Sequence, residues 1–170
     1  IMQSTNMLEV AATVIKNDNC NTNAGQITAA GQYGTAPYQY QAVAAGGTPV
    51  TANWSSANVF NLEGGNYDVY IRDAYNCVKF DNINLPTDPS PVITATIGAQ
   101  CGTDDGDFVI NVVRTQDGVG PYTYSINGGA FVSQAASAFT YGGLTAGSYS
   151  IQVKDVNGCG NTVNLNILAP

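Results

Sequence analysis

Four cysteines carry the most reactive side chains in this 170-residue sequence, which contains no histidine. They are Cys20, Cys77, Cys101 and Cys159, and no two of them form a Cys-x-x-Cys pair. Because protein zinc sites are built from closely spaced cysteine and histidine, this set favours disulfides over a metal centre. Four cysteines permit three connectivities, so the pairing has to come from the fold.

A second group of residues, Asp104-Asp105-Gly106-Asp107, offers the clustered oxygen atoms that calcium prefers. The corresponding stretch in the first half of the chain, residues 23–26, reads Asn-Ala-Gly-Gln and lacks this chemistry. A solvated acidic turn is therefore the favoured interpretation, with calcium binding as the alternative.

The sequence offers little for catalysis. Without histidine, hydroxyl and thiol groups have no obvious general base, and no pair of carboxylates stands out as an acid and base set. No glycine-rich loop opens a helix, as phosphate binding would require. We therefore expect neither an enzyme nor a cofactor.

Aromatic residues could instead bind sugar rings by stacking. The chain has ten tyrosines and one tryptophan, and pattern assigns most of the tyrosines to the core. Trp54 and Tyr70 are the two candidates for ligand contact that the pattern leaves. The net charge of −7 argues against nucleic acid as a partner. The sequence contains no apolar run of about 18 residues, so we expect no insertion into a membrane.

A motif that ends in cysteine occurs twice, and its two copies begin at Leu62 and Leu144. Both copies read Leu-x-x-Gly-x-Tyr, continue with alternating apolar residues and end in Asp-x-x-x-Cys. The shared landmarks are Leu62, Gly65, Tyr67 and Asp73 in the first copy and Leu144, Gly147, Tyr149 and Asp155 in the second. Repetition at a fixed period predicts two similar structural units.

The motif predicts a turn that leads into a half-buried β-strand. Tyr149, Ile151 and Val153 alternate with polar residues and so share one face of an extended chain. A tyrosine at the start of such a strand is typical of the tyrosine corner of β-sandwiches, whose hydroxyl bonds a nearby backbone group. Asp155, like Asp73, is expected to form an Asx turn with its own backbone.

Each half also contains further strand-like segments in the same order. In the first half we predict strands at 8–14, 26–30 and 38–40 and a last strand that ends near residue 85. In the second half we predict strands at 92–97, 108–112, 122–124 and 163–167, with a hairpin turn at 127–129. Residues 46–61 show no clear pattern. The sequence therefore predicts an all-β protein with two tandem immunoglobulin-like β-sandwich domains of six or seven strands each.

Three prolines in Pro86-Thr87-Asp88-Pro89-Ser90-Pro91 mark the boundary, because proline-rich stretches form stiff extended connections. We predict one domain at residues 1–86, a linker at 87–91 and a second domain at 92–170. Residues 1–7 are unpatterned and are interpreted as a linker or an added strand.

The order of these motifs resembles the SprB-type repeat of Bacteroidetes cell-surface proteins. The resemblance rests on Gly-x-x-Pro-Tyr-x-Tyr before the repeated motif and on Asp-x-Asn-Gly-Cys at Asp155 to Cys159. The first unit departs from it, because Asn76 precedes Cys77 where the family has glycine, and both units lack a tryptophan usual after Pro-Tyr-x-Tyr. The resemblance implies a repetitive adhesin or filament on the cell surface, often exported by type IX secretion and in some cases serving gliding motility.

The immunoglobulin-like topology also bears on the cysteines. It places the loop after the first strand and the loop before the last at opposite ends of a sandwich, too far apart for a disulfide within one domain. We therefore favour pairing of Cys20 with Cys159 across the domain junction, which leaves Cys77 and Cys101 for neighbouring repeats or molecules. Pairing within each domain and four free thiols remain alternatives.

These observations favour an extracellular structural protein that forms a stiff, disulfide-stapled shaft with its neighbouring repeats or copies end to end. Two alternatives remain. The chain could be a carbohydrate-binding module that recognises surface glycans, or a fibre subunit whose residues 1–10 add a strand to the sheet of a neighbouring copy.

Overall fold

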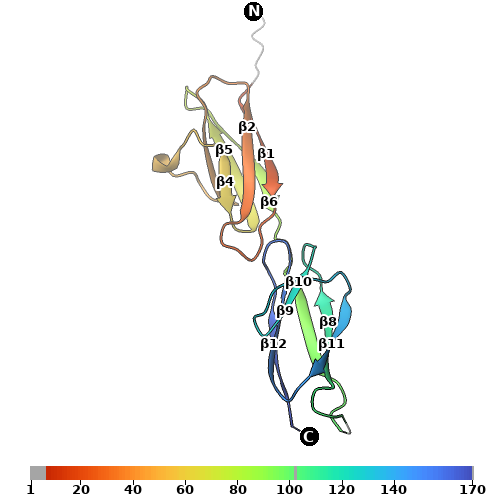
Figure 1. Cartoon of the computed structure of the whole chain (residues 1–170). Helices are drawn as coiled ribbons and strands as arrows, with labels where there is room; N and C mark the ends of the chain where they lie inside the picture. Colours follow the sequence, from red (N-terminus) through yellow and green to blue (C-terminus); the bar gives the residue numbers. More distant parts are fainter. Residues whose placement is uncertain (1–6, 102, 170) are drawn as a thin grey trace, which may run out of the picture. The chain divides into compact units, whose positions relative to one another are not determined.

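The computed structural model describes residues 7–101 and 103–169, and its regular structure there is almost entirely β-strand (Figure 1). The chain divides into two compact units, residues 1–87 and 88–170. The predicted linker or added strand at residues 1–7 lies outside the described residues except for Met7.

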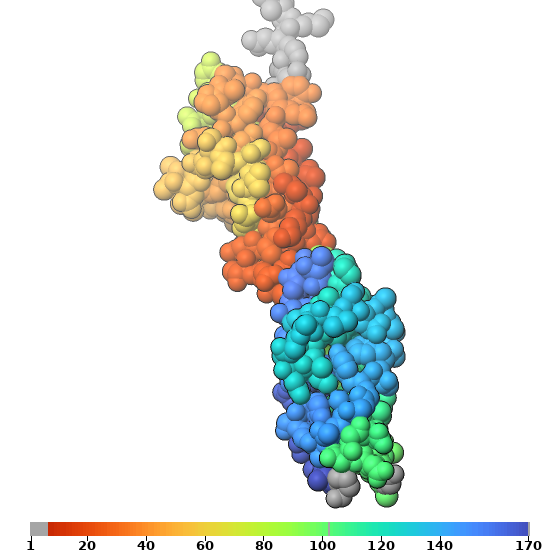
Figure 2. Space-filling model, in the orientation of Figure 1, coloured from red at the N-terminus to blue at the C-terminus, as the bar shows by residue number. Residues whose placement is uncertain are grey.

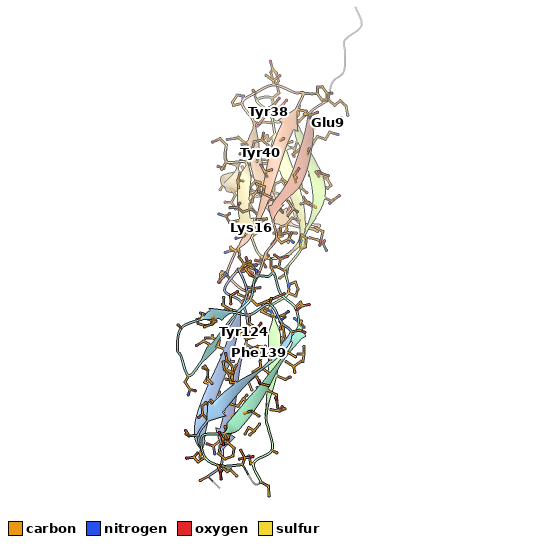
Figure 3. The ribbon with its side chains drawn as sticks, turned by 45° about the vertical axis from the view of Figure 1, so that its right-hand side comes forward. Glu9, Lys16, Tyr38, Tyr40, Tyr124 and Phe139 are labelled. Carbon is orange, nitrogen blue, oxygen red and sulfur yellow. The ribbon has the colours of Figure 1, made fainter. Side chains whose placement is uncertain are left out.

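Unit 1 consists of two antiparallel three-stranded sheets. Its strands are β1 (Glu9–Lys16), β2 (Gly25–Gln32), β3 (Gln39–Ala44), β4 (Val59–Leu62), β5 (Gly65–Arg72) and β6 (Val78–Leu85). One sheet has the order β1-β2-β4 and the other β3-β5-β6. Glu9 and Lys16, labelled in Figure 3, mark the two ends of β1.

The two sheets of unit 1 enclose one apolar core. Ile27 and Ala29 of β2 meet Val69 and Ile71 of β5, and all four side chains are fully buried. These residues sit at alternate positions along their strands, so each strand turns one face inward. The alternation that predicted the strand after Gly65 is therefore the alternation that builds the core.

Unit 2 repeats this arrangement with one more strand. Its strands are β7 (Val92–Ile97), β8 (Phe108–Gln116), β9 (Thr123–Ile126), β10 (Val132–Ser133), β11 (Ala138–Leu144), β12 (Gly147–Lys154) and β13 (Thr162–Ile167). The sheets have the orders β11-β8-β7 and β10-β9-β12-β13. Tyr124 and Phe139 lie side by side between them (Figure 3), with ring centroids 4.8 Å apart in an edge-to-face arrangement.

The strand order in each unit is immunoglobulin-like. The first and second strands pair in one sheet with the strand before the motif, while the third strand joins the motif strand and the last strand in the other. The all-β prediction is confirmed. The hairpin turn is also confirmed, since Asn127 and Gly128 adopt positive φ angles of 50° and 69° between β9 and β10.

Sequence patterns missed the strands that precede the motif. β11 was not predicted, because only Phe139 and Tyr141 mark its inward face and Gly142-Gly143 follow. β4 lies in the segment with no clear pattern. The chain between β3 and β4 forms a protruding loop with a 3-10 turn at Thr51–Asn53 (Figure 1, Figure 2).

Candidate functional site

The two motif tyrosines form the predicted tyrosine corners. Tyr67 donates its hydroxyl hydrogen to the carbonyl oxygen of Glu63 at 2.8 Å, and Tyr149 donates to that of Thr145 at 2.9 Å. Both partners lie four residues earlier, in the turn that leads into the strand. Each tyrosine therefore fixes the turn at the start of β5 or β12 while its ring packs against the core.

A carboxylate in the β5–β6 loop, residues 73–77, gathers backbone N–H groups from two loops. Asp73 Oδ1 accepts hydrogen bonds from the N–H groups of Tyr75 and Cys77, both at 2.9 Å. Its Oδ2 accepts one from Thr35 in the β2–β3 loop at 3.2 Å. Asp73 thus forms the predicted Asx turn and also holds the neighbouring loop. We call this arrangement the aspartate clasp of unit 1.

Unit 2 has the same clasp in its β12–β13 loop. Asp155 Oδ1 accepts hydrogen bonds from the N–H groups of Asn157 and Cys159, both at 2.9 Å. Its Oδ2 accepts one from Val119 in the β8–β9 loop at 3.2 Å. Gly158 precedes the clasp cysteine in unit 2, and Asn76 takes its place in unit 1. Both residues have a left-handed backbone, with φ angles of 80° for Gly158 and 62° for Asn76.

The clasp of unit 1 stabilises the charged form of the Asp73 carboxylate. Burial by itself would raise the pKa of Asp73, but the N–H groups of Cys77, Thr35 and Tyr75 and the Cys77 thiol bond its oxygens and hold the pKa below its ordinary value of 3.8.

The two cysteines of each unit lie at opposite ends of its sandwich. In unit 1, the β1–β2 loop that contains Cys20 meets the end of β6, because Asp18 donates its N–H to the carbonyl of Pro86 at 2.9 Å. Cys77 lies in the aspartate clasp, which meets the β2–β3 loop at the other end. This is the separation on which the expectation about disulfide pairing depends.

The four cysteines divide into two kinds. Cys20 and Cys159 are disulfide-bonded, whereas Cys77 and Cys101 carry free, exposed thiols. Each kind therefore contains one cysteine from the loop after a first strand and one from an aspartate clasp.

Acidic residues of the loops after the first strands also bond to backbone. Asp18 Oδ2 accepts the N–H of Gly64 at 2.7 Å, and Asp105 Oδ1 accepts that of Ala146 at 2.7 Å. Asp18 is only 3 % exposed. Burial by itself would raise the pKa of the Asp18 carboxyl. Hydrogen bonds from Gly64 and from neighbouring backbone N–H groups outweigh this effect and hold the pKa below its ordinary value of 3.8.

The calcium hypothesis for residues 104–107 stays untested. Asp105 is engaged with Ala146, and Asp107 donates its backbone N–H to the carbonyl of Asp104 at 3.1 Å. Within residues 7–101 and 103–169, no three His, Cys, Asp or Glu side chains are grouped closely enough to hold a metal ion. In the same ranges, no helix is long and apolar enough to cross a membrane.

The two candidate ligand residues both lie beside the outer face of the β3-β5-β6 sheet. The Arg72 guanidinium stacks on Trp54, 4.8 Å from the ring centroid. Tyr70 packs against Phe80, with ring centroids 5.0 Å apart, and donates its hydroxyl to the Gly47 carbonyl at 3.0 Å. Trp54 and Tyr70 thus both connect the protruding loop to strand β5. Their role in ligand contact stays a prediction.

Sequence reasoning missed a second set of tyrosine hydroxyl bonds. Tyr122 donates to the carbonyl of Gly118 at 2.9 Å, and Tyr38 donates to that of Tyr33. Both tyrosines follow a cis proline, Pro121 or Pro37. The repeated Gly-x-x-Pro-Tyr pattern was the available signal, since it pairs a tight turn with a tyrosine.

Comparison with known proteins gives similarity only at the level of solved structures. No protein-family model matches the chain, and no curated protein matches it. Domains 4 and 5 of the S-layer protein SbsC align with 95% of this chain and 98% of that one, at 14% identity and a TM-score of 0.34. A structure of SbsC domains 1–6 gives 15% identity and 0.36, covering 97% of this chain and 28% of that one.

The ectodomain of mouse nectin-like molecule 4, Ig1–Ig3, is similar at 13% identity and a TM-score of 0.35, with 95% of this chain and 64% of that one covered. The chain thus spans less than two thirds of this ectodomain and of the longer SbsC structure. TM-scores of this size assign no function.

Proposed function

We propose that the chain is a structural repeat segment of a bacterial extracellular adhesin or filament, and that it acts as a stiff, disulfide-stapled shaft. The observation that carries this proposal is the duplicated unit: both copies have their own core, a tyrosine corner and an aspartate clasp. Tandem units of this kind build long, thin structures from many small cores. We assign the chain no catalytic role.

In this proposal Cys20 pairs with Cys159 and staples the two units. Support comes from their common state, since these two cysteines are disulfide-bonded while the other two are free. Support also comes from the opposite-end placement of Cys20 and Cys77, which argues against a bond within unit 1.

Peptide mapping under non-reducing conditions tests the staple. Free thiols are first alkylated, the chain is digested, and the crosslinked peptides are identified by mass spectrometry. We expect a peptide pair containing Cys20 and Cys159, with Cys77 and Cys101 alkylated. A crosslink between Cys20 and Cys77 would refute the proposed joint.

The family assignment is part of the proposal. Membership among SprB-type repeats would place the chain on the surface of a Bacteroidetes cell, exported by type IX secretion, and in some members would connect it to gliding motility. The motifs from Leu144 to Cys159 are what support it. Surface labelling of the native protein on intact cells tests the location.

A second candidate function is glycan binding by unit 1. It is favoured by Trp54, Tyr70 and Phe80 on the outer sheet face, because Phe80 is 51% exposed there. In unit 2 the cross-strand pair Gln152 and Thr162 takes the place that Tyr70 and Phe80 take in unit 1, so that position has no aromatic ring. Glycan-array binding that is lost in Trp54→Ala would favour this function, whereas no binding to any glycan would favour the shaft.

A further inference from the structure

We propose that Cys77 and Cys101 are the two halves of an intermolecular joint, in which Cys77 of one copy of this chain forms a disulfide with Cys101 of the next. The inference rests on the proposed function, because it takes the Cys20–Cys159 staple as its pattern.

The first observation is that the backbone of the free, exposed Cys77 is held like the backbone of the disulfide-bonded Cys159. In both loops the cysteine N–H bonds the clasp aspartate at 2.9 Å. The aspartate N–H in turn donates to the cysteine carbonyl, at 3.1 Å for Asp73 and 2.9 Å for Asp155. Because two reciprocal hydrogen bonds fix each cysteine, the backbone of Cys77 already has the arrangement that Cys159 has in its disulfide, and ordering it costs no further entropy.

The second observation is that Cys101 occupies the loop equivalent to that of Cys20. Each cysteine lies between the first and second strands of its unit, and in each loop an aspartate binds the turn before the motif strand. Cys101 is exposed. A chain with one free cysteine in a clasp and one in a loop of the other type carries both components of a further joint, one in each unit.

The third observation is apolar complementarity beside the two thiols. A cavity of about 310 Å³ lies next to Cys77, lined by Met7, Leu8, Gly34, Asp73 and Lys79. Met7 is 62% exposed at its rim. Near Cys101, Leu168 is 63% exposed and is held there by Gln100, whose Oε1 accepts its N–H at 3.0 Å. An exposed leucine on one copy can therefore fill an apolar cavity on the next, which favours a second copy as the occupant.

Bond formation needs an oxidant, and we name a small-molecule disulfide such as oxidised glutathione. One cysteine thiolate attacks it, forms a mixed disulfide and releases one glutathione thiol. The second cysteine attacks the mixed disulfide and releases the other glutathione. Two protein thiols are thereby oxidised to one disulfide while one glutathione disulfide is reduced to two thiols. Because the bonded surfaces differ, repetition gives an open chain of copies rather than a closed dimer.

The experiment is a crosslinking series on the full chain in a glutathione redox buffer, read on non-reducing gels. The wild type should give a ladder of covalent multimers that disappears on full reduction. The single variants Cys77→Ser and Cys101→Ser should each give no more multimer than the variant that carries both substitutions. An equimolar mixture of the two single variants should give one covalent dimer, because it restores one thiol of each kind.

Three results would overturn the joint. They are a wild type that stays monomeric, a single variant that dimerises with itself as readily as the mixture does, and a mixture that gives no dimer. Folding is controlled by the melting temperature of each variant, and alkylation of the folded wild type blocks both thiols without any substitution. Leu168→Asp should slow dimer formation in the mixture, whereas the exposed Val156→Asp in the other loop of unit 2 should not.

Failure of this inference and failure of the proposed function give different results. If peptide mapping of the monomer finds Cys20 bonded to Cys159 but no multimers form, the shaft stands and the intermolecular joint falls. If Cys20 is found bonded to Cys77, the pattern itself is lost and both fall.

Discussion

At the scale of single residues, carboxylates in this chain organise loops through backbone N–H groups. Asp155 is 6% exposed and accepts three such hydrogen bonds, two from its own loop and one from the β8–β9 loop. Asp73 does the same in unit 1. The aspartate that follows each motif strand thus has a structural role in these backbone hydrogen bonds.

Replacing Asp155 should destabilise unit 2. Asp155→Ala leaves three backbone donors without their acceptor, and we expect the free energy of unfolding to fall by about 1–3 kcal/mol. Urea denaturation monitored by far-UV circular dichroism measures this free energy of unfolding. Asp107→Ala is the matched control, since Asp107 is exposed, and it should change stability by no more than about 0.5 kcal/mol. Equal effects of the two substitutions would contradict the clasp.

The clasp of unit 1 also predicts the response to acid. The folded-state pKa values of Asp73 and Asp18 lie below 3.8, so at low pH the unfolded chain binds protons that the folded chain does not. Their contribution to stability is therefore complete above the unfolded pKa, at about pH 4 and higher, and is lost as the pH falls through the folded values.

Melting temperatures between pH 7 and pH 2 test this response. We expect a plateau down to about pH 4 and a decline below it. Asp73→Asn should show a shallower decline, because its side chain does not titrate, while Asp107→Asn should follow the wild type. A decline of the same steepness in Asp73→Asn and wild type would show that another group is responsible.

At the scale of elements, turns with positive φ shape the loops that carry the cysteines. Gly158 and Asn76 occupy the same left-handed position before the clasp cysteine, with φ angles of 80° and 62°. Glycine adopts this conformation without strain, and asparagine tolerates it better than other residues with a side chain. This explains why the first unit keeps its clasp without the glycine of the second.

Gly158→Ala isolates the backbone term. Nothing lies within 4 Å of where its Cβ would be, so the cost comes from the left-handed conformation, and we expect a loss of about 1–2 kcal/mol. The control is Gly142→Ala in β11, where φ is not positive and the nearest atom to the new Cβ is 3.8 Å away. Chemical denaturation should show a loss for Gly158→Ala only, and the reverse order would disprove the assignment.

At the scale of the whole molecule, the chain has two separate apolar cores. The cluster in unit 1 includes Ile71 and Val69, and the cluster in unit 2 includes Ile151 and Val153. In each unit the motif strand contributes to the cluster from an inner position of its sheet, as β5 in unit 1 and as β12 in unit 2. Each unit therefore contains the apolar contacts needed for its own cooperative stability.

The matched substitutions Ile71→Ala and Ile151→Ala test the independence of the cores. Both side chains are fully buried, and each loss should cost about 2–5 kcal/mol. Hydrogen exchange read by mass spectrometry should show lost protection in residues 7–87 for Ile71→Ala and in residues 88–169 for Ile151→Ala. Loss of protection across both units from either substitution would show one shared cooperative unit instead.

The sequence by itself determined the repeated elements of this protein. Alternation after Gly65 and Gly147 predicted the strands β5 and β12, and the position of Tyr67 and Tyr149 predicted their hydroxyl bonds. These features could be predicted because they depend on contacts within a few residues and on a period of two.

Tertiary structure decided what depends on residues far apart. Only the fold brings the β2–β3 loop to Asp73, and only the fold places Phe80 beside Tyr70. β11 escaped prediction because it is held by pairing with β8, from Ala138 opposite Val113 to Leu144 opposite Phe108, rather than by a pattern of its own. The state of each cysteine likewise depends on which thiols the folded chain brings together, which their spacing in the sequence does not specify.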